Sequence, residues 1–100
     1  MNYMLHVVEE AIEETAEAYS WYEDKQIGLG ERFLAELENM FRLIQDKPFA
    51  FKQSYRKVRI GILSTFPFMV IFTIKEEEIV VHSVFHTSRN PTVWRKRMKR

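Results

Sequence analysis

The spacing of apolar residues changes along the chain and separates a helical first half from an extended second half. The short apolar run Met4–Val8, with its two valines, predicts a first strand. Apolar residues then recur every three or four positions, which is the helical period, so two helices are expected at roughly 9–26 and 30–46. Gly28 and Gly30 interrupt this pattern, and one of them is expected to adopt the left-handed conformation that closes a helix.

The second half of the chain follows the two-residue period of strands. Around Val58–Ile62 apolar residues alternate with polar ones, so Lys57 and Arg59 are expected to share the exposed face of a strand. Phe68–Ile74 is apolar almost throughout and predicts a central strand, and Ile79–His86 predicts a third. The element order is therefore β-α-α-β-β-β, an α+β fold in which a helical hairpin packs on an antiparallel sheet.

The same periodicity predicts which side chains fill the core and which meet solvent. The residues expected in the core are Tyr19, Tyr22, Phe33, Leu37, Phe41, Val70 and Phe72. Ile12 and Ala16 extend the apolar stripe of the first helix, and Trp21 lies off this stripe, where it could contact a partner. The acidic residues expected to be solvated are Glu10, Glu13, Glu14, Glu17, Glu23 and Asp24.

Length and composition narrow the class of protein. With 100 residues and 46% hydrophobic content, one domain spanning residues 1–100 is expected. Cysteine is absent, which excludes disulfides and thiolate metal sites. No apolar run approaches the ~18 residues of a membrane span, and the first ten residues lack the features of a signal peptide. A cytoplasmic location without membrane contact is therefore expected.

A net charge of +1 conceals a strong division of charge between the two halves. Residues 1–50 carry four basic and eleven acidic residues, a balance of −7, and residues 51–100 carry eleven basic and three acidic residues, a balance of +8. The division favours two faces with different partners over two surfaces that are merely solvated. In a three-stranded meander the Lys57–Arg59 face and the end of the last strand can lie close together. They would then form one positive surface suited to a nucleic acid or an acidic protein segment.

The sequence offers few residues that could bind a metal ion or a cofactor. His82 and His86 fall in the same strand, about 13 Å apart along the chain, which is too far to share one ion. The sequence contains no phosphate-binding glycine loop and no zinc-protease motif. No metal and no cofactor are expected.

Several ordered fragments resemble the RelE/ParE superfamily of toxins from type II toxin–antitoxin systems, and ParE-like members most closely. The fragments of the first two thirds are Trp21-Tyr22-Glu23, Gly28-Leu29-Gly30, Phe33, Pro48, Val58-Arg59 and Phe66-Pro67-Phe68. The last third supplies His86, Arg89, Pro91, Trp94 and Arg97, in the spacing H-x-x-R-x-P-x-x-W-x-x-R. Together they cover nearly the whole chain, and the family's fold has the β-α-α-β-β-β order derived above.

The resemblance implies a toxin that pairs with a cognate antitoxin in a hetero-oligomer, and it leaves two targets open. ParE-like members bind and inhibit DNA gyrase. RelE-like members cut messenger RNA on the ribosome without a metal, using basic residues and often a tyrosine. A third possibility is a protein that keeps the toxin fold without toxicity.

Two departures from the RelE pattern favour gyrase over the ribosome and messenger RNA. The stretch Phe66–Met69 replaces an arginine common near the start of the central strand, and Trp94 stands in the region of the C-terminal tyrosine. A ribonuclease site could still form from Lys57, Arg59, His86 and Arg89, because a histidine side chain can act as an acid or a base near neutral pH. The catalytic residues therefore stay unassigned. The residues expected to contact the target are Lys57, Arg59, His86, Arg89, Trp94, Arg95 and Arg97.

Overall fold

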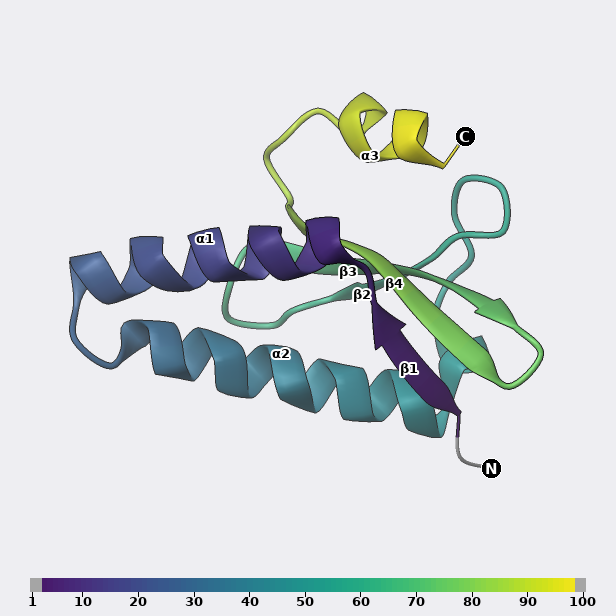
Figure 1. Ribbon diagram of the computed structural model, residues 1–100, viewed down its shortest axis with the longest axis horizontal. Helices are drawn as coiled ribbons and strands as arrows, with labels where there is room; N and C mark the ends of the chain where they lie inside the picture. The colour runs from purple at the N-terminus through teal and green to yellow at the C-terminus, as the bar shows by residue number, and fades with distance from the viewer. Residues whose placement is uncertain (1–2, 99–100) are drawn as a thin grey trace.

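The computed structural model describes residues 3–98 and contains a helical hairpin, a four-stranded sheet and a short C-terminal helix (Figure 1). The elements are β1 (Met4–Val7), α1 (Glu9–Lys25), α2 (Leu29–Asp46), the 3-10 turn η1 (Pro48–Ala50), β2 (Arg59–Ile62), β3 (Phe68–Lys75), β4 (Glu78–His86) and α3 (Thr92–Arg97). The predicted β-α-α-β-β-β order is confirmed, and α3 follows it in the expected basic tail. Lys99 and Arg100 of that tail lie outside the described residues.

The sheet has the strand order β1-β4-β3-β2. The strands β2, β3 and β4 form the predicted antiparallel meander. β1 joins the other edge and runs parallel to β4, with Leu5 opposite Ile79 and Val7 opposite Val81. β1 thus lies beside the last strand of the meander rather than beside β2, the strand that follows it in the chain.

The turn between α1 and α2 depends on two glycines and one carboxylate. Gly28 has a φ of 90°, which is the predicted left-handed conformation. At Gly30 a β-carbon would lie only 2.8 Å from the backbone oxygen of Tyr19, so the close approach of the helices requires glycine there. Glu23 accepts hydrogen bonds of 2.9 Å from the backbone nitrogens of both glycines. Glu23 is therefore a turn-forming residue rather than the solvated acid that the sequence predicted.

The core lies on both faces of the sheet. The main cluster, between the hairpin and the sheet, includes Phe33, Leu37, Val70 and Phe72, as predicted. A smaller cluster on the other face holds Val58, Ile71, Phe85 and Trp94 beneath α3. In the view of Figure 1, α1 lies between α2 and α3.

The prediction that Tyr19 lies in the core is wrong, because α1 is rotated relative to the predicted stripe. Ala11 and Ala18, two helical turns apart, face the sheet, whereas Ile12 is 55% exposed. Tyr19 points toward α2, where its hydroxyl donates a 2.7 Å hydrogen bond to Glu31. The small alanines let α1 approach the sheet closely. The predicted core residues Tyr22 and Phe41 are half-buried against the main cluster.

The prediction that Lys57 shares a strand face with Arg59 is also wrong. Residues 55–57 form a turn, in which the Val58 nitrogen donates to the Tyr55 oxygen at 3.0 Å and Arg56 has a φ of 56°. The strand therefore begins only at Arg59, and Lys57 is exposed on the preceding turn.

Candidate functional site

Trp94 fixes the C-terminal helix to the sheet. Its side chain is 2% exposed and packs with Val58, Ile71 and Phe85. The ring of Tyr55, from the loop before β2, lies edge-on to it at 6.2 Å. Trp94 thus holds α3 and this loop in place, and its indole ring is not available at the surface for direct contact with a target.

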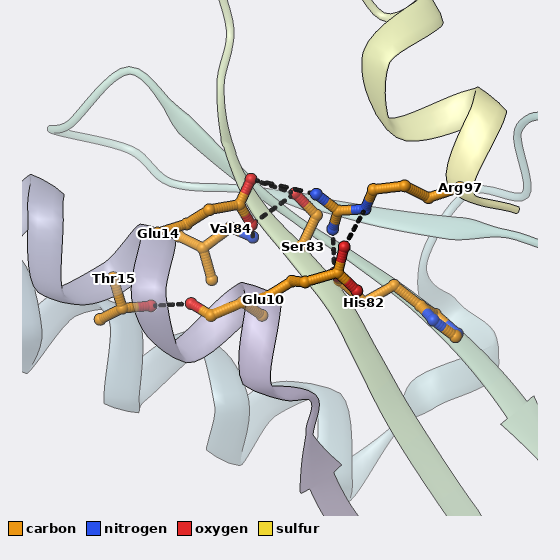
Figure 2. Close-up of polar contacts among 8 residues, drawn as sticks. Glu10, Glu14, Thr15, His82, Ser83, Val84 and Arg97 are labelled. Atoms are coloured by element: carbon orange, nitrogen blue, oxygen red, sulfur yellow. Dashed lines mark hydrogen bonds and ion pairs between the residues drawn. The ribbon is translucent and has the colours of Figure 1, made fainter.

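Arg97 turns back from α3 and joins it to α1 and β4, as Figure 2 shows. Its Nη1 lies 3.4 Å from Oε2 of Glu14, and its Nε lies 3.8 Å from Oε2 of Glu10. Its Nη2 donates to the backbone oxygen of His82. With 19% of its side chain exposed, Arg97 is a largely internal connector in this structure.

Glu14 closes the edge of β4 where β1 ends. β1 pairs with β4 only as far as Val81, so the backbone beyond it has no neighbouring strand on that side. The Glu14 carboxylate accepts 2.9 Å and 3.1 Å bonds from the Ser83 hydroxyl and the Val84 nitrogen, in addition to the pairing with Arg97 (Figure 2). The prediction that Glu14 is only solvated is wrong. The spacing of apolar residues does not reveal that the Val84 nitrogen, on an unpaired strand edge, needs a hydrogen-bond acceptor.

Basic residues gather around the sheet face that α3 covers; most of them are exposed, and Arg95 is half-buried. Arg95 lies 5.4 Å from the Tyr55 ring centroid, and so does Arg56 from the loop beside it. Arg89 lies 4.8 Å from the ring of Phe85, which itself packs in the cluster around Trp94. Two exposed lysines lie next to these arginines in the chain: Lys57 follows Arg56 in the turn before β2, and Lys96 follows Arg95 in α3. We call the five residues together the basic strip: Arg56, Lys57, Arg89, Arg95 and Lys96.

Arg59 lies apart from His86. It donates a 2.7 Å hydrogen bond to the backbone oxygen of Phe51 and packs 5.2 Å from the ring of Phe49. In the register Arg59 is opposite Phe72, whereas His86 is opposite Phe68. Four residues of β3 separate these positions by about 13 Å, and a strand spacing is added across the sheet. The structure therefore does not bring Arg59 next to His86, although the sequence left that arrangement open.

His86 is held in a tight turn at the end of β4. The Arg89 nitrogen donates to the His86 oxygen at 3.1 Å, and the Ser88 nitrogen donates to Nδ1 of the imidazole at 3.1 Å. The ring also packs edge-on to Phe68, with centroids 5.0 Å apart. Because Nδ1 accepts from a backbone N–H, the proton of the neutral ring belongs on Nε2, which can then act as a hydrogen-bond donor.

A cavity of about 570 Å³ opens between α1, the start of β3 and this turn. Its walls are formed by Glu14, Glu17, Ala18, Trp21, Tyr22, Pro67, Phe68, Val84, His86, Ser88 and Arg89. Trp21 is 58% exposed on the rim, in agreement with the prediction that it lies off the core stripe. Burial raises the pKa of Tyr22 above its ordinary value of 10.0. The sequence flagged His86, Arg89 and Trp21 separately, and only the fold places them around one cavity.

The site combines charged and aromatic side chains. Within residues 3–98 no three histidine or acidic side chains converge to hold a metal ion. Over the same span, no helix is long and apolar enough to cross a membrane. Charge on the basic strip and an apolar cavity beside it are the features by which proteins recognise acidic partners with apolar anchors.

Comparisons with known proteins agree with this fold. Residues 6–91 match the sequence family described as "ParE toxin of type II toxin-antitoxin system, parDE". The chain is also similar to a solved structure titled "Chromosomal ParDE TA system from P. aeruginosa", with a TM-score of 0.77 and 16% identity over 86% of this chain and 97% of that one. No curated protein sequence matches it. At this identity the structural likeness shows the fold, and the family match rests on the sequence itself.

Proposed function

The chain belongs to the ParE toxin family of type II toxin–antitoxin systems, and we propose that it is the toxin of such a pair and acts by binding DNA gyrase. Growth inhibition would then follow from loss of topoisomerase activity rather than from cleavage of a nucleic acid. The target-binding surface in this proposal is the basic strip, including Arg89, Arg95 and Lys57. Trp94 and Arg97 support this surface from beneath.

The observation that favours binding over catalysis is the separation of Arg59 from His86. A metal-free ribonuclease must move protons at two oxygens and stabilise charge on the phosphorane, all at one phosphate. Here about 13 Å along β3 separates the residue opposite Arg59 from the residue opposite His86. Nδ1 of His86 is also engaged by Ser88. One histidine with one neighbouring arginine is a poor basis for the two-proton reaction.

A RelE-like ribonuclease is the alternative, and one observation supports it. His86 and Arg89 face the same cavity, so a donor or general base and a fixed positive charge could meet a single phosphate there. A toxin fold without toxicity is the remaining alternative, which the experiment below also separates.

The proposed regulatory partner is a cognate antitoxin in a toxin–antitoxin hetero-oligomer. An antitoxin segment rich in acidic residues would complement the basic strip, because opposite charge favours encounter and sets orientation. The proposed location of both proteins is the cytoplasm, where gyrase acts.

Expression of the chain alone in bacteria tests the proposal, with co-expression of the product of the neighbouring open reading frame as the control. We expect growth arrest, relaxed plasmid DNA and intact messenger RNA, all reversed by the neighbouring product. Cleaved messenger RNA with normal supercoiling would establish the ribonuclease instead. Normal growth with abundant folded protein would indicate a toxin fold without toxicity. Growth arrest that the product of the neighbouring open reading frame does not relieve would contradict the proposed toxin–antitoxin pairing.

A further inference from the structure

The cavity beside the basic strip has the composition of an anchor site for a protein segment. Its apolar walls include Trp21, Tyr22, Phe68 and Val84, and its volume of about 570 Å³ is in the range that holds a large side chain with its flanking groups. A tryptophan 58% exposed on the rim of such a cavity leaves apolar surface in water that a partner can cover. One face of Trp21 is already occupied by Lys25, whose Nζ lies 4.8 Å from the ring centroid.

The charges around the cavity give the ligand an orientation. Arg89 lies on the turn after β4, where the basic strip begins, and the Nε2 donor of His86 belongs to the last residue of β4. Glu17 lies on the α1 side, and the charge of Glu14 is already paired with Arg97. A carboxylate is therefore favoured at the end of the cavity that meets the basic strip and disfavoured beside Glu17 on α1.

A second apolar groove lies on the outer face of the hairpin, but its charges suit a different ligand. It is lined by Val7, Ile12, Thr15, Ala16, Tyr19, Ser20, Glu31, Leu34, Leu37, Glu38 and Phe41. The only charged side chains in this lining are the acids Glu31 and Glu38, so an acidic segment would be repelled there. The cavity that Arg89 lines differs from this groove because it adjoins the positive charge of the basic strip.

We propose that the cavity at Trp21, Phe68 and Arg89 binds an acidic segment of the antitoxin. One aromatic or aliphatic side chain of that segment inserts between α1 and the end of β4, and a neighbouring carboxylate pairs with Arg89. Further acidic residues then follow the basic strip toward Arg95 and Arg56. This inference rests on the proposed toxin–antitoxin pairing and adds to it the site, the chemistry and the direction of the bound segment.

The test measures the affinity of the purified chain for the product of the neighbouring open reading frame. Trp21→Ala removes the apolar wall and Arg89→Glu reverses the charge, and both residues are exposed enough for folding to be preserved. We expect Trp21→Ala to weaken binding about 30-fold or more, the scale of a buried aromatic anchor. Arg89→Glu should weaken it about 10-fold and reduce its salt dependence.

The matched controls are Ile27→Ala, at a position 92% exposed in the hairpin turn, and Arg32→Glu, an exposed arginine of α2. Both controls should stay within about three-fold of the unchanged chain. If Trp21→Ala and Arg89→Glu bind as tightly as the unchanged chain and Tyr19→Ala loses most of its affinity, the segment binds in the outer groove and the assignment is overturned. If the unchanged chain binds no neighbouring product, the proposed pairing fails and this site fails with it.

Discussion

Nη1 of Arg97 in α3 lies 3.4 Å from the carboxylate of Glu14 in α1, and this contact ties the C-terminal helix to the first helix of the fold. Glu14 in turn accepts from Ser83 and Val84, so one carboxylate connects α1, α3 and the open edge of β4. Arg95 and Lys96 lie on the helix that this contact holds. The stability of the fold is therefore coupled to the position of α3 through a pair of residues that is largely, though not fully, shielded from solvent.

The first prediction concerns Arg97→Met, which keeps much of the side-chain volume and removes the charge. Glu14 loses its ion pair and His82 loses a donor to its backbone oxygen. We expect a loss of about 1–2 kcal/mol in the free energy of unfolding, less than for a fully buried pair because both side chains keep some contact with water. Urea denaturation followed by circular dichroism measures it.

A double-mutant cycle with Glu14→Gln provides the control for that value. If the two residues act through their mutual contact, the double variant should lose clearly less stability than the sum of the single losses. Strictly additive losses would mean that the contact contributes nothing and that Arg97 acts elsewhere.

The second prediction is that Trp94 is a core residue whose replacement destabilises the whole fold. Trp94→Ala should reduce the free energy of unfolding by about 3–5 kcal/mol, because it leaves a large cavity beneath α3. The neighbouring Val93 is 40% exposed, so Val93→Ala is expected to change the free energy of unfolding by less than about 1 kcal/mol. Thermal unfolding of the two variants should separate them widely, and equal midpoints would show that α3 is not held by Trp94.

The order of the secondary elements could be predicted because each half of the chain has one clear period. The alternation in the second half predicts the meander, and Gly28 and Gly30 separate two helical runs. Periodicity does not reveal which strand lies beside β1, so its parallel pairing with β4 could not be predicted. It also misplaced the buried face of α1, since two small residues, Ala11 and Ala18, define that face better than the large Tyr19.

The candidate site was only partly visible in the sequence. Basic residues, Trp21 and His86 could be identified by type, but charge does not say whether an arginine faces solvent or an internal carboxylate. Arg97 and Arg95 are two positions apart in α3, yet the first pairs with Glu14 and the second lies over Tyr55. Lys57 was assigned to a strand because alternation continues into the turn, where the left-handed Arg56 ends the extended conformation.

The third prediction concerns the pH dependence of stability through His82. Burial, followed by the nearby charge of Arg97, lowers the pKa of His82 below its ordinary value of 6.5, against a smaller opposing effect of Glu10. Its ring is also hydrogen-bonded to the Thr73 hydroxyl at 2.8 Å. The unfolded chain therefore binds this proton more readily than the folded one. The contribution of His82 is fully present above about pH 6.5 and is lost as the pH falls toward the lowered pKa.

Denaturant unfolding at several pH values between about 5 and 8 tests this direction. The unchanged chain should lose stability below about pH 6.5, and His82→Gln should reduce the slope while retaining a polar group near Thr73. An identical slope in the variant would assign the pH dependence to other groups.

Inhibition of DNA gyrase by the purified chain tests the central claim most directly. In a supercoiling assay, the account predicts that the unchanged chain and His86→Gln inhibit gyrase equally. Replacing Arg56, Arg89 and Arg95 of the basic strip together by glutamine should raise the inhibitory concentration about 10-fold or more. The contradictory result is normal supercoiling by gyrase in the presence of the folded chain, together with cleavage of ribosome-bound messenger RNA that His86→Gln reduces by about 10²-fold.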